Sequence, residues 1–435
     1  MGTTAGNTGP ELDRRVSHPR TRSRRTRLVG GSQAGECSRP MCRHARPRWT
    51  RVRTAAEILG CLWFISGCGP SDASLDRTVP VHWAISEDST RSFSLGGLDA
   101  CSDCIGFELA VVLGDRTGPG YVVHTEHALR DSLGRYWLGQ YRDMIKVFDA
   151  AGNYIQTVGR FGEGPEEFDM PLPNFVDPGG RVHVIDVGNI RETIVGPDFD
   201  FLETNPLPLR PRQIVPLPGG AGFVANAPIQ SVEALGHPLH IIRGSKVVRS
   251  FGGLETGISN PLSVSRKIAV DREGRIYSTP VTEFLIEVWT QTGRRIVGFR
   301  GLPLRESDPD FDPSIRSGAP RSAIQGLRVD SSDRLWSLIL KPRDAWRDHM
   351  IADPLSGGGI ALRPVDDDPS KVYTSQVVVV DLATSSIVAR SERDELFMGF
   401  LGDHSLIEAR QLEDGTPQVA VWNLELLERI ETNQN

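Results

Sequence analysis

Motifs that identify an enzyme directly are missing from this 435-residue sequence. It has no Gly-x-Ser-x-Gly nucleophile elbow and no His-Glu-x-x-His metal motif. The histidines of the later part of the chain are scattered rather than clustered: His124, His127, His183, His237, His240, His349 and His404. The sequence therefore assigns no catalytic residue.

The chain also lacks an overall excess of basic residues. Its net charge is −6, and because the first 53 residues are rich in arginine, the remainder is more acidic than that value indicates. Phosphate contacts need clustered lysine and arginine, so no nucleic-acid partner is predicted. The 45 glycines and 30 prolines favour many turns and few long helices.

The apolar run near the N-terminus, residues 58–65, is too short to span a bilayer permanently. Arginines precede it in 46–53, which gives the pattern of a secretory signal. It ends in Ile65-Ser66-Gly67-Cys68, which resembles a bacterial lipobox and predicts lipidation at Cys68. Glu57 departs from this pattern, and the alternative interpretation is a buried strand with a chance cysteine.

These features predict three parts. Residues 1–67 are expected to be a disordered, Arg-rich lead with a lipoprotein-type signal peptide, 68–100 a polar tether, and 101–435 the folded body. A start at Met41 would leave a signal of the usual length, so we hypothesise that Met41 is the true start. The protein would then lie at the bacterial cell envelope, anchored by lipid and facing the periplasm or the surface.

Two cysteines remain once the signal is removed and Cys68 is lipidated. Cys101-Ser102-Asp103-Cys104 predicts a structural disulfide, the default for a C-x-x-C outside the cytosol. A thioredoxin-like role would need a helix after the first cysteine, which 105–107 does not supply. A zinc site would need a second ligand pair of similar spacing.

A short turn recurs along the chain and is followed each time by an alternating apolar segment. The four copies are Asp131-Ser-Leu-Gly-Arg135, Asp177-Pro-Gly-Gly-Arg181, Asp271-Arg-Glu-Gly-Arg275 and Asp330-Ser-Ser-Asp-Arg334. Aspartate caps its own backbone two residues on, and glycine supplies the positive φ of a tight reversal. Each turn therefore predicts a junction between two short strands.

With the strands that follow, the turns define units that predict an all-β, six-bladed β-propeller. The units are 121–168, 175–207, 212–254, 266–302, 325–393 and 396–432. An upstream segment, 107–112 together with 121–124, is expected to supply a strand that closes the ring with the last blade. A β-sandwich is the competing fold, but it does not explain the repeated turn.

The segment 145–168, IKVFDAAGNYIQTVGRFGEGPEEF, resembles the bacterial six-bladed β-propeller lipoprotein family related to NHL repeats. The matching positions are Val147, Phe148, Asp149, Gly152, Gly159, Arg160, Gly162, Gly164, Pro165, Glu167 and Phe168. Later units keep only fragments of this pattern. The resemblance implies the fold and export, and says little about function.

Three segments carry residues suited to binding. The loop 159–168 lacks the lysine and the helix of a phosphate cradle, and is interpreted as a connection between blades in which Arg160 and Glu163 are candidate ligand contacts. Asp308, Asp310 and Asp312 have calcium-like spacing but lack the glycine and distal glutamate of an EF-hand, so calcium is considered without a metal site being assigned.

The third segment is an insertion, 341–371, within the fifth unit. It contains Arg343, Trp346, Arg347 and His349, and exposed tryptophan and arginine are residues that anchor interfaces. Long insertions in repeat arrays project from one face and carry binding. The alternative interpretation is a mobile, partly disordered loop.

The sequence thus predicts a monomeric binding module for an unknown protein or small-molecule ligand, with no cofactor. The alternative function is a metal-dependent lyase or lactone hydrolase, with ligands from several blades in the central channel. A purely structural role is the third hypothesis. Blade register decides between them, because a one-residue slip reverses which side chains face the channel.

Overall fold

The computed structural model describes residues 92–96, 100–123, 125, 127–140, 144–227, 236–253, 264–301, 304, 315–317, 319–356, 358–365 and 368–427. The chain divides into two units, Met1–Gly69 and Pro70–Asn435, and every described residue belongs to the second. The predictions for the signal, Cys68, most of the tether and Asp308, Asp310 and Asp312 lie outside the described residues. Among the described residues, no helix has the length and apolarity to cross a membrane.

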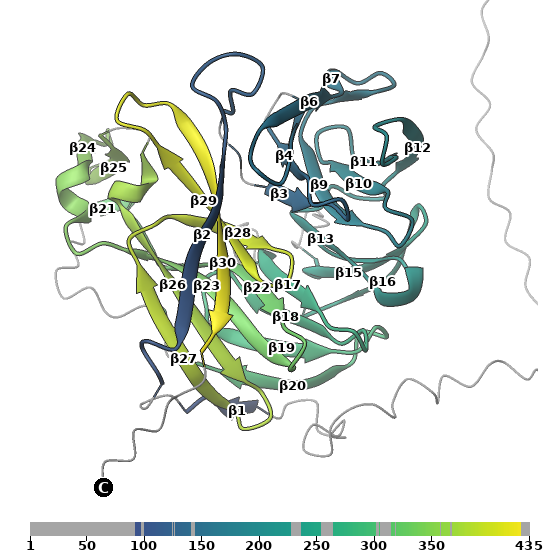
Figure 1. Cartoon of the computed structure of the whole chain (residues 1–435). Helices are drawn as coiled ribbons and strands as arrows, with labels where there is room; N and C mark the ends of the chain where they lie inside the picture. The colour runs from purple at the N-terminus through teal and green to yellow at the C-terminus, as the bar shows by residue number, and fades with distance from the viewer. Residues whose placement is uncertain are drawn as a thin grey trace, which may run out of the picture. The chain divides into compact units, whose positions relative to one another are not determined.

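The second unit is a six-bladed β-propeller, as the repeats predicted (Figure 1). Each blade is a four-stranded antiparallel sheet whose strands follow one another from the centre of the ring outward. Blade 1 is β3 (His127–Arg130), β4 (Tyr136–Gly139), β5 (Ile145–Phe148) and β6 (Tyr154–Val158); blade 2 is β9 (Pro171–Val176), β10 (Val182–Asp186), β11 (Arg191–Val195) and β12 (Phe201–Pro206); blade 3 is β13 (Gln213–Pro216), β14 (Phe223–Asn226), β15 (Leu239–Arg243) and β16 (Lys246–Phe251).

The second half of the ring continues in the same way. Blade 4 is β17 (Arg266–Val270), β18 (Ile276–Pro280), β19 (Leu285–Trp289) and β20 (Arg295–Arg300); blade 5 is β22 (Ala323–Val329), β23 (Arg334–Pro342), β26 (Tyr373–Asp381) and β27 (Ser386–Arg393); blade 6 is β28 (Phe397–Leu401), β29 (Ser405–Gln411), β30 (Pro417–Leu426) and β2 (Ile105–Leu113). The six units read from the sequence therefore coincide with the six blades.

The ring closes through its inner strands and through the N-terminal strand. The inner strands touch in cyclic order, β3, β9, β13, β17, β22, β28 and again β3. Strand β2 pairs antiparallel with β30, which places an early strand of the described chain beside its last strand (Figure 1). The predicted closing strand over 107–112 is confirmed, whereas 121–123 lie outside any strand.

Short strands lie outside the six blades. β1 (Ser92–Ser94) pairs parallel with β20, so the predicted tether contributes a strand to blade 4. β7 (Arg160–Phe161) pairs with β8 (Glu167–Phe168), between blades 1 and 2. A three-stranded sheet combines β21 (Ile315–Ser317), β24 (Met350–Pro354) and β25 (Ile360–Pro364).

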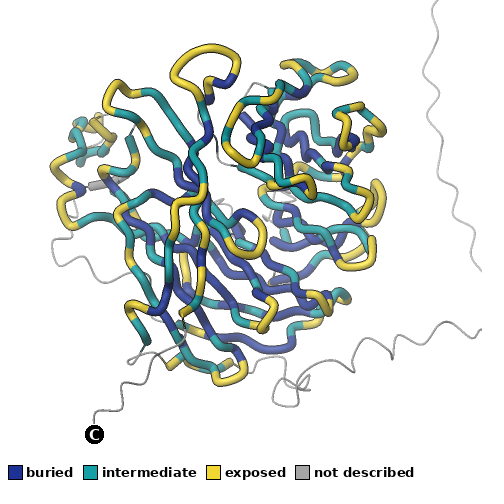
Figure 2. The backbone as a smooth tube through the Cα atoms, in the orientation of Figure 1, coloured by how far each residue is buried: buried dark blue, intermediate teal, exposed yellow. Residues whose placement is uncertain are grey.

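The hydrophobic core is divided into six clusters, and each lies between two successive blades. Between blades 1 and 2, for example, Trp137 and Val147 pack with Val182, Val195 and Phe168, all buried. A four-stranded blade cannot bury its faces alone, so the ring is stabilised by these interfaces. Figure 2 shows the buried stretches in the strands and the exposed ones in the turns.

The repeated aspartates tie each turn to the strand that follows it. Asp131 Oδ1 accepts the backbone N–H groups of Leu133 and Arg135 at 3.0 and 2.9 Å. Asp131 Oδ2 accepts Arg135 Nε at 2.6 Å and Trp137 Nε1 at 2.9 Å. One carboxylate therefore fixes the turn, the arginine and the strand that follows the turn.

The other Asp turns repeat this arrangement. Asp330 accepts Arg334 Nε and Trp336 Nε1, both at 2.9 Å, and Asp271 accepts Arg275 Nε and the Tyr277 hydroxyl. The fourth turn residue has positive φ whether it is Gly134 (81°) or Asp333 (58°). Aspartate is among the few non-glycine residues that tolerate this region, which explains why 330–334 keeps the fold without glycine.

Candidate functional site

The two faces of the propeller differ in the length of their connections. In an antiparallel meander, successive connections leave opposite ends of the strands. The connections from first to second strand in every blade, and from third to fourth strand in blades 1 to 5, form one face, the turn face, and all are short. The remaining connections form the other face, the loop face. It carries all the longest connections, which are β2 to β3, β6 to β9, β14 to β15, β16 to β17, β20 to β22 and β23 to β26.

The connection from β23 to β26, residues 343–372, corresponds to the predicted insertion 341–371, whose first two residues belong to β23. β23 and β26 pair along their whole length, and Pro342 lies opposite Tyr373. The two ends of the insertion therefore meet. At this base Arg343 donates Nε to the Ser370 carbonyl at 2.7 Å, Nη1 to Asp394 Oδ1 at 2.6 Å and Nη2 to the Asp394 carbonyl at 2.8 Å.

The body of the insertion is folded. A short 3₁₀ helix, η5 (Trp346–His349), leads into β24, which forms an antiparallel hairpin with β25. β21, from the connection between blades 4 and 5, pairs parallel with β25 (Figure 1). A second 3₁₀ helix, η6 (Pro369–Lys371), returns to β26 and is capped by Asp368, which accepts the Ser370 N–H at 3.0 Å. Within the described residues, the insertion is an ordered structure attached to blade 5.

Trp346 is not the exposed anchor that the sequence suggested. It is only 7% exposed, and the Arg347 guanidinium lies 4.5 Å from its ring centroid. His349 is half-buried, and its carbonyl accepts the Val365 N–H at 2.9 Å. Arg343 is engaged at the base, so three of the four residues singled out in this segment hold the insertion together. Among its described residues, the exposed large apolar side chains are instead Leu355 and Val365, 39% and 53% exposed.

Arg160 lies on β7 and Glu163 in the turn between β7 and β8, between blades 1 and 2 and apart from the insertion on blade 5. Arg160 Nε donates to Glu167 Oε1 at 2.8 Å. Arg191, which the sequence did not single out, donates to the carbonyls of Glu163 and Gly164 at 3.0 Å each. The loop is thus braced from blade 2, and Phe168 packs in the core between the blades. The Glu163 residue itself remains exposed.

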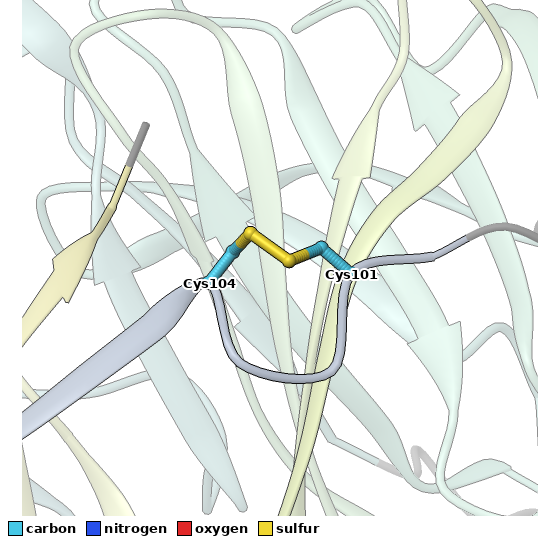
Figure 3. Close-up of a disulfide and its surroundings, with 2 residues drawn as sticks. All are labelled: Cys101 and Cys104. Atoms are coloured by element: carbon cyan, nitrogen blue, oxygen red, sulfur yellow. A yellow bond between two sulfur atoms is a disulfide. The ribbon is translucent and has the colours of Figure 1, made fainter. Parts of the chain in front are cut away.

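Cys101 and Cys104 are joined by a disulfide, with 5.5 Å between their Cα atoms (Figure 3). The Cys101 N–H donates to the Val388 carbonyl on β27, and the Cys104 carbonyl accepts the Leu427 N–H after β30. The disulfide loop therefore links blade 5 to blade 6 immediately before β2.

Among the described residues, one group of metal-capable side chains comes together: Asp271, Glu273 and Asp333, within 4.8 Å of one another. It lies on the turn face, not on the inner strands. Arg275 donates to all three carboxylates, at 3.1 Å to Glu273 and 3.2 Å to Asp333 and more closely to Asp271. The guanidinium takes the position that a cation would need.

Polar side chains of the inner part of the ring bind backbone of the neighbouring blade. Gln213 donates Nε2 to the Ile268 carbonyl at 3.1 Å and accepts the Ile268 N–H at 2.8 Å. Gln325 Nε2 donates to the Met398 carbonyl at 3.1 Å. Buried His240 is hydrogen-bonded to Ser250 and the Ala227 carbonyl, and burial lowers its pKa. The two glutamines therefore join neighbouring blades, whereas His240 bonds within blade 3. In the described part of the ring, these three side chains belong to no cluster of carboxylates and imidazoles.

No protein-family profile and no curated protein match this chain. Among solved structures, a protein of Bacteroides fragilis described as a candidate exported protein aligns over 77% of this chain and 99% of its own, with 11% identity and a TM-score of 0.48. A member of the DUF4221 family from Bacteroides vulgatus aligns over 75% and 99%, with 10% identity and a TM-score of 0.48. Virginiamycin B lyase of Staphylococcus aureus aligns over 74% and 100%, with 12% identity and a TM-score of 0.39. Similarity at this level carries no argument about function.

Proposed function

We propose that this protein is an exported, lipid-anchored β-propeller that binds a protein partner at the bacterial cell envelope through the insertion on its loop face. The observation that carries the proposal is that the insertion is folded although no residue of 343–372 belongs to an inter-blade core of the described chain. The lipobox-like 65–68 segment supports export and anchoring at Cys68.

The fold of blade 5 does not require this insertion. Pro342 and Tyr373 are paired neighbours, and a two-residue turn is the usual connection between strands so placed. Ordering a residue costs about 1 to 2 kcal/mol of backbone entropy. An ordered insertion that adds little to the core is therefore best explained by a role outside the core, and binding loops are commonly held on rigid scaffolds in this way.

The surface of the insertion combines apolar and charged groups. Leu355 and Val365 are exposed, and Arg363 pairs with Asp353 at 2.8 Å on the hairpin. Apolar side chains beside paired charges are typical of protein-binding surfaces, whose centre excludes water and whose rim stays polar. Leu355 lies in the turn of the hairpin between β24 and β25.

Site-specific photocrosslinking in living cells tests the proposal. A photoreactive amino acid at Leu355 should give a discrete crosslinked product. The same group at Leu202, a leucine 49% exposed on β12, should not. In a further experiment the photoreactive amino acid replaces Arg363. The double variant Leu355→Ala with Val365→Ala should then give less crosslinked product, whereas Leu202→Ala with Val248→Ala should give the same amount as the otherwise unchanged protein.

Replacing 343–372 by Asn-Gly provides the complementary test. The circular dichroism spectrum should remain that of a β protein, and the partner isolated by crosslinking should no longer bind. A variant that still binds this partner with wild-type affinity would refute the role of the insertion.

A further inference from the structure

The outer edge of blade 3 carries a group of basic side chains, in a chain whose net charge is −6. Arg243 ends β15, and Lys246 and Arg249 lie on β16, the outermost strand of the blade. All three are exposed, and the surrounding hairpin, 237–253, contains no aspartate or glutamate. These three residues are called the basic edge below.

The side chains of the basic edge stand on one face of the hairpin. Arg243 lies opposite Lys246, and Arg249 lies opposite Ile241. Opposite residues of an antiparallel pair share a face, and so do residues two apart on one strand. Because Ile241 belongs to the core between blades 3 and 4, the basic edge lies on the side of blade 3 that is next to blade 4.

The basic edge lacks an internal counter-charge. Several exposed cations elsewhere pair with carboxylates, such as Arg116 with Asp414 at 2.6 Å and Lys341 with Glu392 at 2.8 Å. Within the described chain, no carboxylate lies within ion-pair distance of a basic-edge side chain. Cations on an edge strand protect it from pairing with another strand, but three of them on one face without a counter-charge also form a surface that attracts a polyanion.

The N-terminal segment of the described chain begins close to the basic edge. β1 pairs parallel with β20, so its N-terminal end is directed toward Arg295 at the start of β20, and Arg295 Nη2 donates to Ser92 Oγ at 2.9 Å. The turn that precedes β20 lies against β16, since a Cβ on Gly293 would be 3.2 Å from Arg249 Cγ. Ser92 therefore lies next to the turn that contacts the basic edge.

A bilayer with anionic lipids is the polyanion best placed to meet this edge. Residues 69–91 separate Ser92 from the predicted lipidation site at Cys68, so an anchored chain keeps blades 3 and 4 near the membrane. Such tethering raises the effective concentration for a weak contact. Val248 is 51% exposed between the cations, and because of a bulge it has no opposite residue on β15. An apolar group among basic ones suits the boundary between headgroups and acyl chains.

We propose that the basic edge docks on anionic phospholipid headgroups, so that the ring stands on its rim at the membrane. Arg243, Lys246 and Arg249 contact lipid phosphates, and Val248 enters the interface between them. The loop face with its insertion stays free of the bilayer. The inference rests on the proposed anchoring at Cys68 for bringing the protein to the membrane, whereas the contact itself depends on the basic edge.

Photolabelling in vesicles tests the docking. The full-length protein, purified from the cells that produce it, is reconstituted into phosphatidylcholine vesicles with or without phosphatidylglycerol. A photoreactive amino acid at Val248 should give lipid adducts when phosphatidylglycerol is present, and high salt should abolish them. The same group at Leu109, 44% exposed on β2 of blade 6, across the ring from blade 3, should give none. Equal adducts at both positions, or adducts at Val248 that do not depend on phosphatidylglycerol, would overturn the proposal.

Two triple variants of equal net charge test the residues. The first removes the basic edge with Arg243→Gln, Lys246→Gln and Arg249→Gln. It should lower the equilibrium constant for docking about 100-fold, because each cation at an anionic surface contributes about fivefold. The second, Arg116→Gln, Arg130→Gln and Arg160→Gln, changes exposed arginines on the opposite side of the ring and should leave docking unchanged. All six positions are exposed, so both variants should fold. Equal docking of the two variants would contradict the proposal.

Flotation of the vesicles distinguishes this proposal from the anchoring on which it rests. Protein that floats but gives no lipid adduct at Val248 overturns the docking alone. Protein that does not float contradicts the anchoring, and docking is then measured by sedimentation with the same vesicles. The two triple variants share one N-terminus, so the basic-edge variant should bind about 100-fold more weakly than the control, and equal binding would refute docking. In living cells, a discrete protein adduct at Val248 in place of lipid would assign this edge to a protein partner and overturn the proposal.

Discussion

Trp137 donates its indole N–H to Asp131, six residues earlier, at 2.9 Å, although the ring belongs to the core between blades 1 and 2. The same six-residue relationship joins Trp336 to Asp330 and Tyr277 to Asp271. At the corresponding place in blade 2, His183 Nε2 lies 3.6 Å from Asp177. The repeat thus includes a polar aromatic residue, which connects each turn to the interface between blades.

Asp131→Ala should destabilise the protein by about 3 kcal/mol or more, because it removes the acceptor of Arg135 and Trp137 and leaves both donors partly buried. Trp137→Phe keeps the ring and should cost about 1 to 2 kcal/mol. Urea unfolding measures both. Asp149→Ala, at an exposed turn with a similar cap, is the control and should cost less. If Asp131→Ala and Asp149→Ala lowered the free energy of unfolding equally, the structural role of the Asp131–Trp137 pair would be contradicted.

A second prediction concerns acid stability. Burial opposes ionisation of Asp177, but hydrogen bonds from the Arg181 side chain and backbone outweigh it and bring the pKa of Asp177 from 3.8 to about 2. A carboxylate whose folded pKa is depressed stabilises the protein above its unfolded pKa. That stability should be lost as pH falls from about 4 to about 2. Asp177→Asn should therefore lower the urea midpoint at pH 5 more than at pH 2.5, whereas Asp344→Asn, at an exposed residue, should change little at either pH.

The blades could be predicted from sequence because their determinants are local. Asp131, Asp177, Asp271 and Asp330 each fix a reversal within five residues, and alternation follows at once. The sequence also contains the Asp-x₅-aromatic spacing, which would have predicted that Trp137 and Trp336 pack in the cores between blades. The turn of the third blade lacks this aspartate, and Leu217-Pro-Gly-Gly-Ala-Gly222 takes its place in the repeat.

The candidate sites could not be predicted, because they depend on contacts between distant segments. Trp346 is buried by the fold of the insertion itself, and nothing in its local pattern distinguishes it from an exposed anchor. The partner of Arg343 is Asp394, from the next connection in the ring. Arg328 and Phe107 line one cavity only because β2 completes blade 6, a pairing across nearly the whole described chain.

The disulfide gives a third prediction. In the chain-entropy account, closing so short a loop stabilises the fold by roughly 2 kcal/mol. Cys101→Ser with Cys104→Ser should lower the free energy of unfolding by about that amount, measured with urea, and should increase hydrogen exchange in β2 more than in β5. The wild type under reducing conditions should behave in the same way. Exchange that rises equally in both strands would show that the loop does not hold β2 specifically.

Lipidation is the fourth prediction. Cells supplied with labelled palmitate should incorporate the label into the wild type but not into Cys68→Ser, and only the wild type should fractionate with membranes. Cys61→Ser, in the same apolar stretch, is the control and should remain labelled. A labelled Cys68→Ser protein would refute the assignment of the lipidated residue. Mutation of Met41 tests the start site separately, and normal expression without Met41 would contradict that hypothesis.

The last prediction concerns divalent metals. Because Arg275 already pairs with Asp271, Glu273 and Asp333, the thermal melt of the wild type should be unaffected by EDTA. Arg275→Gln removes the internal cation and leaves three carboxylates together, so it should lower the melting temperature, and added calcium should partly restore it. Arg294→Gln, at an exposed turn of the same blade, is the control and should not respond to calcium. A wild-type melting temperature that falls with EDTA would instead indicate a resident metal and favour the channel enzyme over the binding module.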